Sequence, residues 1–218
     1  MNEIKQYQND ITERIRSIKQ SFHLMMDGAV AHSMREKGLQ YNVNWGVTLP
    51  RLREKADEIG KNGTLATALW KENSRECKIL ATMIMPSKEM TPELTDLWME
   101  QTPTIEIAEQ AAFNLFQFLP YAAYIAYRWV SKDNYIYQIC GFHIFSRLFI
   151  KKCNPNKRGI NEFIDQVIVS LQSQNISVRK AAMQSLIRFM ELNIVYERIA
   201  KSALKQNGLS ICLFDYIT

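Results

Sequence analysis

The sequence has few of the residues that form tight turns: its 218 residues include only 8 glycines and 6 prolines. An all-β fold of this length needs many such turns, so their scarcity argues against β structure and favours helices. Hydrophobic residues make up 47% and charged residues 22%, both ordinary for a globular protein. The length fits one large domain better than two.

Signatures of metal, disulfide and membrane proteins are also missing. The histidines do not cluster with the cysteines, which lie far apart without a CxxC pair at Cys77, Cys140, Cys153 and Cys212. We therefore expect no metal site, no disulfide framework and no cofactor. No uninterrupted apolar stretch approaches about 18 residues, and the charged N-terminal sequence lacks the apolar core of a signal peptide. These absences predict a soluble, cytoplasmic protein without membrane contact.

The positive charge is concentrated in the second half of the chain. Residues 1–100 contain 14 Lys/Arg and 14 Asp/Glu, which leaves 13 of the 27 basic and 8 of the 22 acidic residues for the remainder, and with them the whole net charge of +5. A one-sided basic surface is typical of nucleic-acid-binding proteins, because neutralising phosphates releases counterions. The alternative is a solvated basic face that only supports solubility.

Helical periodicity predicts a chain of short helices. In the first 60 residues we expect helices from Ile4 to the break at Ser21, over 24–37 and over 52–59, with a loop at 39–50. Two helices joined by a short turn should follow over 64–85. Thr91 should cap the next helix, and Pro120 should interrupt the long apolar stretch 104–130.

An internal repeat with an offset of 41 residues is visible when 129–149 is aligned with 170–190. In each copy an Asn (Asn134, Asn175) precedes a small residue by six positions (Cys140, Ala181) and an Arg by thirteen (Arg147, Arg188). The Asn is suited to capping a helix, and the small residue lets neighbouring helices approach closely. A period of about 40–47 residues built from helix pairs is typical of HEAT repeats.

The predicted fold is therefore all-α: an α-α superhelix of HEAT-like helix pairs in a single solenoid domain spanning 1–218. Its predicted parts are N-terminal helices over 1–60, repeats over about 64–207 and a short C-terminal tail over 208–218.

Two stretches resemble the DNA alkylation repair family of HEAT-like alkylpurine DNA glycosylases over about 40–205. The first comprises GVTLPRLREKA at 46–56 with LWKENSRECKILATMIM at 69–85, and the second is WVSKDNYIYQICGFHIF at 129–145. The resemblance implies a HEAT-like DNA-binding protein. In active members it also implies removal of N3- or N7-alkylated bases with the help of a Trp–Asp pair, an Arg and a second Trp.

Carried onto this chain, that functional set is incomplete. Trp98 occupies the first aromatic position, and Glu100 is the only carboxylate that can replace the Asp, so these two are the catalytic candidates. Ile139 stands at the Arg position and Gln184 at the second Trp position. Glu106 is an alternative catalytic carboxylate. If Glu106 instead has a structural role, we expect it to form an ion pair with Arg128 or Arg147.

The candidate DNA-binding residues are basic side chains of the second half: Lys132, Arg147, Lys151, Lys152, Arg179, Lys180 and Arg188. The expected partner is DNA, double-stranded and including damaged or branched forms, held through its phosphates. Two alternatives stay open: an active alkylpurine glycosylase, and a scaffold that binds another protein.

Overall fold

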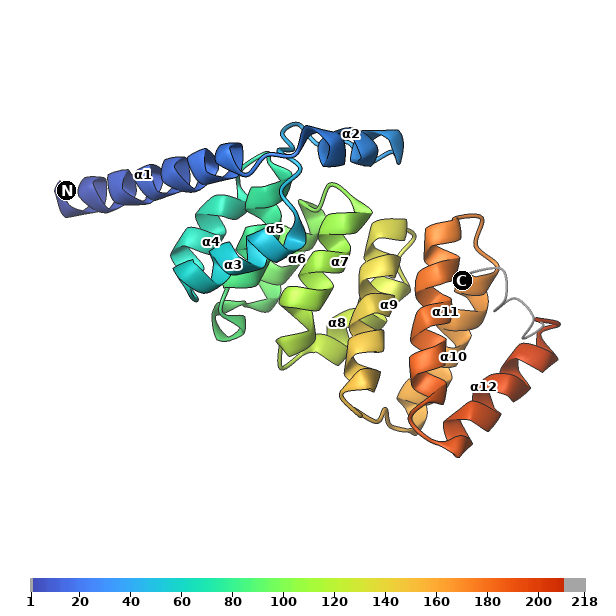
Figure 1. Ribbon diagram of the computed structural model, residues 1–218. Helices are drawn as coiled ribbons and strands as arrows, with labels where there is room; N and C mark the ends of the chain where they lie inside the picture. The colour runs from blue at the N-terminus through green and yellow to red at the C-terminus, as the bar shows by residue number, and fades with distance from the viewer. Residues whose placement is uncertain (1, 210–218) are drawn as a thin grey trace. The chain divides into compact units, whose positions relative to one another are not determined.

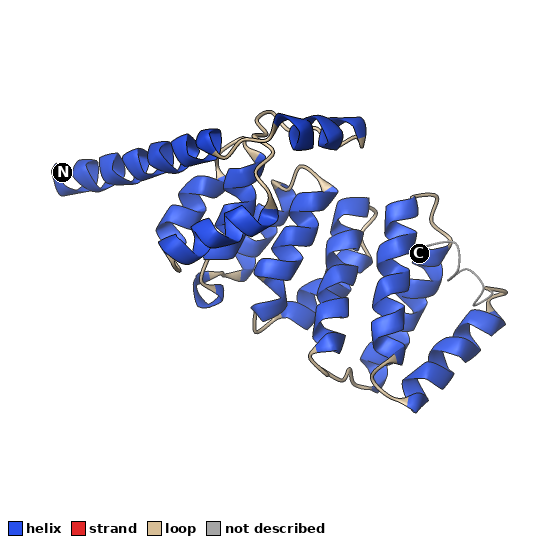
Figure 2. Ribbon diagram, in the orientation of Figure 1, coloured by secondary structure: helices blue, strands red, loops and turns tan. Residues whose placement is uncertain are grey.

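The computed structural model describes residues 2–209, and this range contains α-helices, two short 3-10 helices and no strand (Figure 2). The α-helices are α1 (Asn2–Leu24), α2 (Gly28–Glu36), α3 (Leu49–Ile59), α4 (Gly63–Trp70), α5 (Arg75–Ile84), α6 (Pro92–Glu100), α7 (Ile105–Asn114), α8 (Ala122–Val130), α9 (Tyr135–Ile150), α10 (Lys157–Leu171), α11 (Ile176–Met190) and α12 (Ile194–Gln206). The 3-10 helices are η1 (Ser87–Glu89) and η2 (Phe116–Phe118). The all-α prediction is therefore confirmed. None of the helices within 2–209 is long and apolar enough to cross a membrane.

The chain divides into two compact units between Leu115 and Phe116. The prediction of one domain over 1–218 stays a prediction, and the part of the predicted tail at 210–218, which includes Cys212, lies outside the described residues.

The first unit is organised around α5, which packs against α3, α4 and α7 (Figure 1). Its core includes two stacked indole rings, because Trp70 of α4 and Trp98 of α6 lie parallel with ring centroids 4.2 Å apart. The loop before α3 is fixed to α5 by the backbone N–H of Arg75, which donates to the carbonyl oxygen of Val43 at 3.0 Å. Gly46 in this loop has a φ of 73°, and a Cβ there would lie 2.1 Å from the carbonyl oxygen of Asp27. The glycine at this position of the family-like sequence is therefore explained by the lack of space for a side chain.

Within residues 116–209, the second unit contains the 3-10 helix η2, two helix pairs and a final helix. The helices of each pair, α8 with α9 and α10 with α11, pack together, and α9 also packs along α11 (Figure 1). The predicted caps are confirmed: the Asn134 side chain accepts hydrogen bonds from the first turn of α9, and Asn175 does the same for α11. The small residues Cys140 and Ala181 are buried, as the repeat predicts.

Most predicted helix boundaries lie within a few residues of the observed ones. The second helix starts at Gly28 instead of 24, because Asp27 caps it by accepting a hydrogen bond from Val30 N–H at 3.0 Å. The long apolar stretch breaks at Leu115, before Pro120, where φ and ψ are −135° and −60°. Trp70 and Trp129 are each almost fully buried and serve as packing residues.

Candidate nucleic-acid interface

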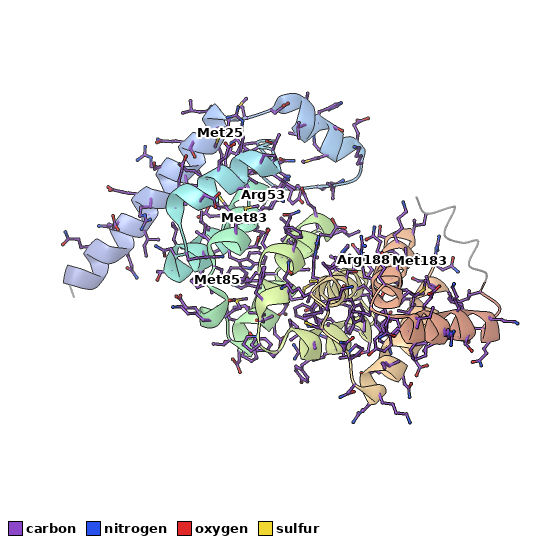
Figure 3. The ribbon with its side chains drawn as sticks, turned by 60° about the horizontal axis from the view of Figure 1, so that its bottom comes forward. Met25, Arg53, Met83, Met85, Met183 and Arg188 are labelled. Atoms are coloured by element: carbon purple, nitrogen blue, oxygen red, sulfur yellow. The ribbon has the colours of Figure 1, made fainter. Side chains whose placement is uncertain are left out.

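Two neighbouring helices of the second unit, α9 and α11, present equivalent arginines. Each helix begins after an Asn cap, and thirteen residues beyond that cap lie Arg147 and Arg188. The two helices pack side by side, and both arginines line the same hollow. Figure 3 labels Arg188 on α11.

A hollow of about 310 Å³ separates the two arginines. Its lining is formed by His143, Ser146, Arg147, Ile150, Gln184, Ile187 and Arg188. Burial lowers the pKa of the half-buried Arg147, and the positive charge of Arg188 lowers it further. An arginine stays protonated in proteins in any case, so the hollow contains two cations that repel each other.

Arg188 has an acidic partner at the surface. Arg188 donates to Glu191 at 2.8 Å, but both side chains are about half exposed, so solvent weakens the pair. Among residues 2–209, no Asp or Glu contributes to the lining itself. An anion placed between the arginines would therefore interact favourably with both of them.

Two lysines extend the positive charge at the C-terminal end of α9. The Lys151 ammonium lies 3.9 Å from the centroid of the exposed Phe118 ring and donates to the carbonyl oxygen of Gln117 at 3.2 Å. Lys152 has a φ of 61°, an uncommon conformation for a residue other than glycine, and its ammonium lies 3.4 Å from the carbonyl oxygen of Glu191. Both side chains are exposed at the end of the helix that carries Arg147.

The other three predicted DNA-binding residues lie at the opposite, N-terminal ends of α9 and α11. Lys132 precedes the cap of α9 and its ammonium lies 4.2 Å from the ring centroid of Tyr137. Arg179 and the exposed Lys180 belong to the first turns of α11, and Arg179 donates to the carbonyl oxygen of Ser173 at 2.5 Å. The predicted set thus forms two groups. At 1.5 Å per residue, about 18 Å of helix separate the start of α9 from Arg147, and about 12–14 Å separate Arg179 and Lys180 from Arg188 in α11.

The catalytic candidates Trp98 and Glu100 belong to the first unit, where the Trp98 side chain is buried and the Glu100 side chain is exposed. Trp98 is 1% exposed, and one face of its ring is covered by Trp70. Glu100 is exposed at the last position of α6. The aromatic ring is consequently unavailable for stacking on a base in this conformation.

Glu106 belongs to a buried ion-pair network that the sequence did not predict. Its carboxylate accepts hydrogen bonds from Arg75, the shortest at 2.6 Å, and from the hydroxyl of Tyr41 at 2.5 Å. Arg75 also donates to Glu76 at 3.2 Å and to the carbonyl oxygen of Val47 at 2.9 Å. The partner of Glu106 is thus Arg75, within its own unit, in place of the Arg128 or Arg147 expected from the sequence.

Protonation in this network follows from burial and charge. Burial lowers the pKa of Arg75, but the hydrogen bonds and negative charge of Glu106 outweigh that effect and raise the pKa above its ordinary value. Burial also raises the pKa of the Tyr41 hydroxyl, and Glu106 raises it further. Arg75 and Glu76 are part of the family-like sequence, and their role here is to bind the loop before α3 to α5 and α7.

The two remaining family positions also have defined locations. Ile139, at the expected Arg position, is 1% exposed inside the second unit. Gln184, at the position of the expected second Trp, is exposed and lines the hollow between Arg147 and Arg188. Within residues 2–209, no group of three or more His, Cys, Asp or Glu side chains is arranged to hold a metal ion.

Comparison with known proteins gives one family and one fold. A family model described as DNA alkylation repair enzyme matches residues 18–205, most of the chain. A solved structure described as "a new family of proteins related to the HEAT-like repeat DNA glycosylases with affinity for branched DNA structures" is similar with a TM-score of 0.78 and 15% sequence identity, covering 88% of this chain and 82% of that one. No curated protein sequence matches. The structural similarity establishes the HEAT-like repeat fold.

Proposed function

We propose that this chain, which belongs to the DNA alkylation repair enzyme family, binds the phosphate backbone of DNA and lacks ordinary glycosylase activity. The proposed contact surface, called the α9–α11 face, carries the basic residues of these two helices and of the segments that flank α9: Lys132, Arg147, Lys151, Lys152, Arg179, Lys180 and Arg188. The observation that supports this most is the pair of arginines, Arg147 and Arg188, across a hollow whose lining includes no Asp or Glu of the described residues.

Phosphate contact is the chemistry that suits this face. Arginine and lysine provide charge and hydrogen-bond donors that match phosphate oxygens. The N-terminal ends of α9 and α11 add partial positive charge next to Lys132 and Lys180. Such contacts fix the position of the nucleic acid without reading base edges, so affinity without strong sequence preference is expected.

The proposed loss of glycosylase activity is supported by the positions that the family uses for chemistry. Ile139 cannot supply the positive charge of an arginine, and Gln184 offers no aromatic face. The Trp98 ring is covered, and Glu106 is already bound to Arg75 and Tyr41. Catalysis at an alkylated purine requires a carboxylate that stabilises the developing charge on the sugar, and a carboxylate neutralised by arginine serves that purpose poorly.

Binding to duplex DNA should weaken steeply with salt. If all seven predicted residues contact phosphates, a plot of log affinity against log salt has a slope of roughly −6, and contacts through the Arg147 end alone give roughly −4, at about −0.9 for each phosphate. Fluorescence anisotropy with labelled linear duplexes and four-way junctions between 50 and 300 mM salt measures these slopes. The similar structure has affinity for branched DNA, and tighter binding to the junction is the expected order. Absence of binding at the lowest salt would favour the protein scaffold.

Release of alkylated bases should not exceed the rate without protein. Incubation of the chain with methylated duplex DNA, followed by chromatography of the released 3-methyladenine and 7-methylguanine, tests this. Hydrolysis of the N-glycosidic bond that disappears in Glu100→Gln would instead establish the enzyme and contradict this part of the proposal.

A further inference from the structure

The first unit contains a polar hollow of about 460 Å³ that the DNA-binding proposal does not use. It lies where the loop before α3, the turn between α4 and α5, and the residues after α6 come together. The lining residues that matter for its chemistry are Asn42, Lys71, Asn73, Ser74, Lys78 and Gln101.

Lys78 is the central feature of this hollow. The residue is only 8% exposed, and its ammonium donates to the carbonyl oxygen of Trp70 at 2.8 Å and lies 4.4 Å from the centroid of the Trp70 ring. No carboxylate of residues 2–209 forms an ion pair with it, since Glu106 pairs with Arg75 and Glu72 pairs with Lys19. An ammonium group that is removed from water without a counter-charge is costly, and burial accordingly lowers the pKa of Lys78.

The other lining groups favour an anion over a cation. Lys71 adds a second positive charge at the exposed rim, and no Asp or Glu lines the hollow. The amides of Asn42, Asn73 and Gln101 offer N–H donors, and two of the three ammonium hydrogens of Lys78 remain after its bond to Trp70. Hydrogen-bond donors in the lining of a hollow that also contains a buried positive charge are the groups that bind phosphate oxygens.

We propose that this hollow is a binding site for a phosphate group, carried either by a small phosphorylated molecule or by a nucleic-acid strand. Lys78 supplies the charge-assisted hydrogen bond from the floor of the site, and Lys71 supplies long-range attraction from its rim. The site belongs to the first unit and does not depend on the α9–α11 face, so the two proposals can fail separately.

The indole N–H of Trp70 provides a direct probe, because it donates to the side-chain oxygen of Gln101 at 3.1 Å at the edge of the hollow. Titration of ¹⁵N-labelled chain with inorganic phosphate at constant ionic strength should shift the Trp70 indole resonance saturably. Chloride should not shift it, and neither anion should shift that of Trp129 in the second unit.

Two variants separate binding from folding. Lys78→Met removes the charge but keeps the apolar stem, and Gln101→Glu keeps an oxygen for the Trp70 indole while adding a negative charge. Each should weaken phosphate binding by about tenfold or more, because a hydrogen bond to a charged group is lost or opposed. Lys88→Met removes an exposed lysine of the same unit outside the hollow and should leave the affinity unchanged.

The result with DNA identifies the source of the phosphate. An oligonucleotide that displaces inorganic phosphate assigns the site to a nucleic-acid strand, and one that does not assigns it to a small phosphorylated molecule. The proposal is overturned if the resonance does not shift saturably, if chloride has the same effect, or if both folded variants bind phosphate as tightly as the unaltered chain.

Discussion

Arg75→Met should lower the free energy of unfolding of the first unit by about 3–5 kcal/mol, because it leaves carboxylates buried without their counter-charge. Arg75 is 1% exposed and binds Glu106, Glu76 and the carbonyl oxygen of Val47. Methionine keeps much of the volume but none of the donors. Urea unfolding followed by tryptophan fluorescence measures the change, since Trp45, Trp70 and Trp98 all belong to this unit.

The matched control is an exposed ion pair of the same unit. Glu58→Gln removes the partner of Lys55 on the surface of α3 and should cost less than about 0.5 kcal/mol. Adding Glu106→Gln to Arg75→Met should recover part of the lost stability, because one uncompensated charge is removed. A cost for Arg75→Met as small as that of Glu58→Gln would show that the buried network does not hold this unit together.

Replacing both arginines of the α9–α11 face, Arg147→Gln with Arg188→Gln, should weaken duplex binding by roughly 30- to 100-fold near 0.1 M salt. Two phosphate contacts are removed, so the slope of log affinity against log salt should also become shallower by about 1.8. Fluorescence anisotropy across the same salt series gives both quantities, and circular dichroism shows whether the helices remain.

A control with the same loss of charge separates contact from net charge. Arg51→Gln with Lys88→Gln removes two exposed cations of the first unit and should change affinity less than threefold. Equal losses in the two double variants would mean that the α9–α11 face has no special role and that overall charge attracts the DNA.

The parts of the fold that were predictable depend on short-range chemistry. Asn134 and Asn175 cap helices because their side chains bond backbone N–H groups two or three residues away, and a 41-residue offset reveals them. The same offset relates Arg147 to Arg188, so the central pair of the candidate DNA site was available from sequence. The start of α2 at Gly28 was missed because the capping side chain of Asp27 competes with an apolar pattern that continues before it.

The features that were not predictable depend on contacts between distant positions. Glu106 meets Arg75 across 31 residues and Tyr41 across 65, and no periodicity within a helix indicates either partner. Trp98 stacks on Trp70, 28 positions earlier, and no local pattern indicates this contact. The seven basic residues belong to α9, to α11 and to the segments that flank α9, and only the packing of α9 beside α11 brings Arg147 and Arg188 to one hollow.

The separation between Tyr41 and Glu106 has a consequence during biosynthesis. Ribosomes add about 5–20 residues per second, so roughly 3–13 s pass between the synthesis of the tyrosine and that of the carboxylate that receives its hydrogen bond. Throughout that interval the loop before α3 has no α7 to anchor it, and Arg75, once synthesised, lacks the counter-charge of Glu106. The loop before α3 therefore gains its full set of hydrogen bonds only after α7 has been synthesised.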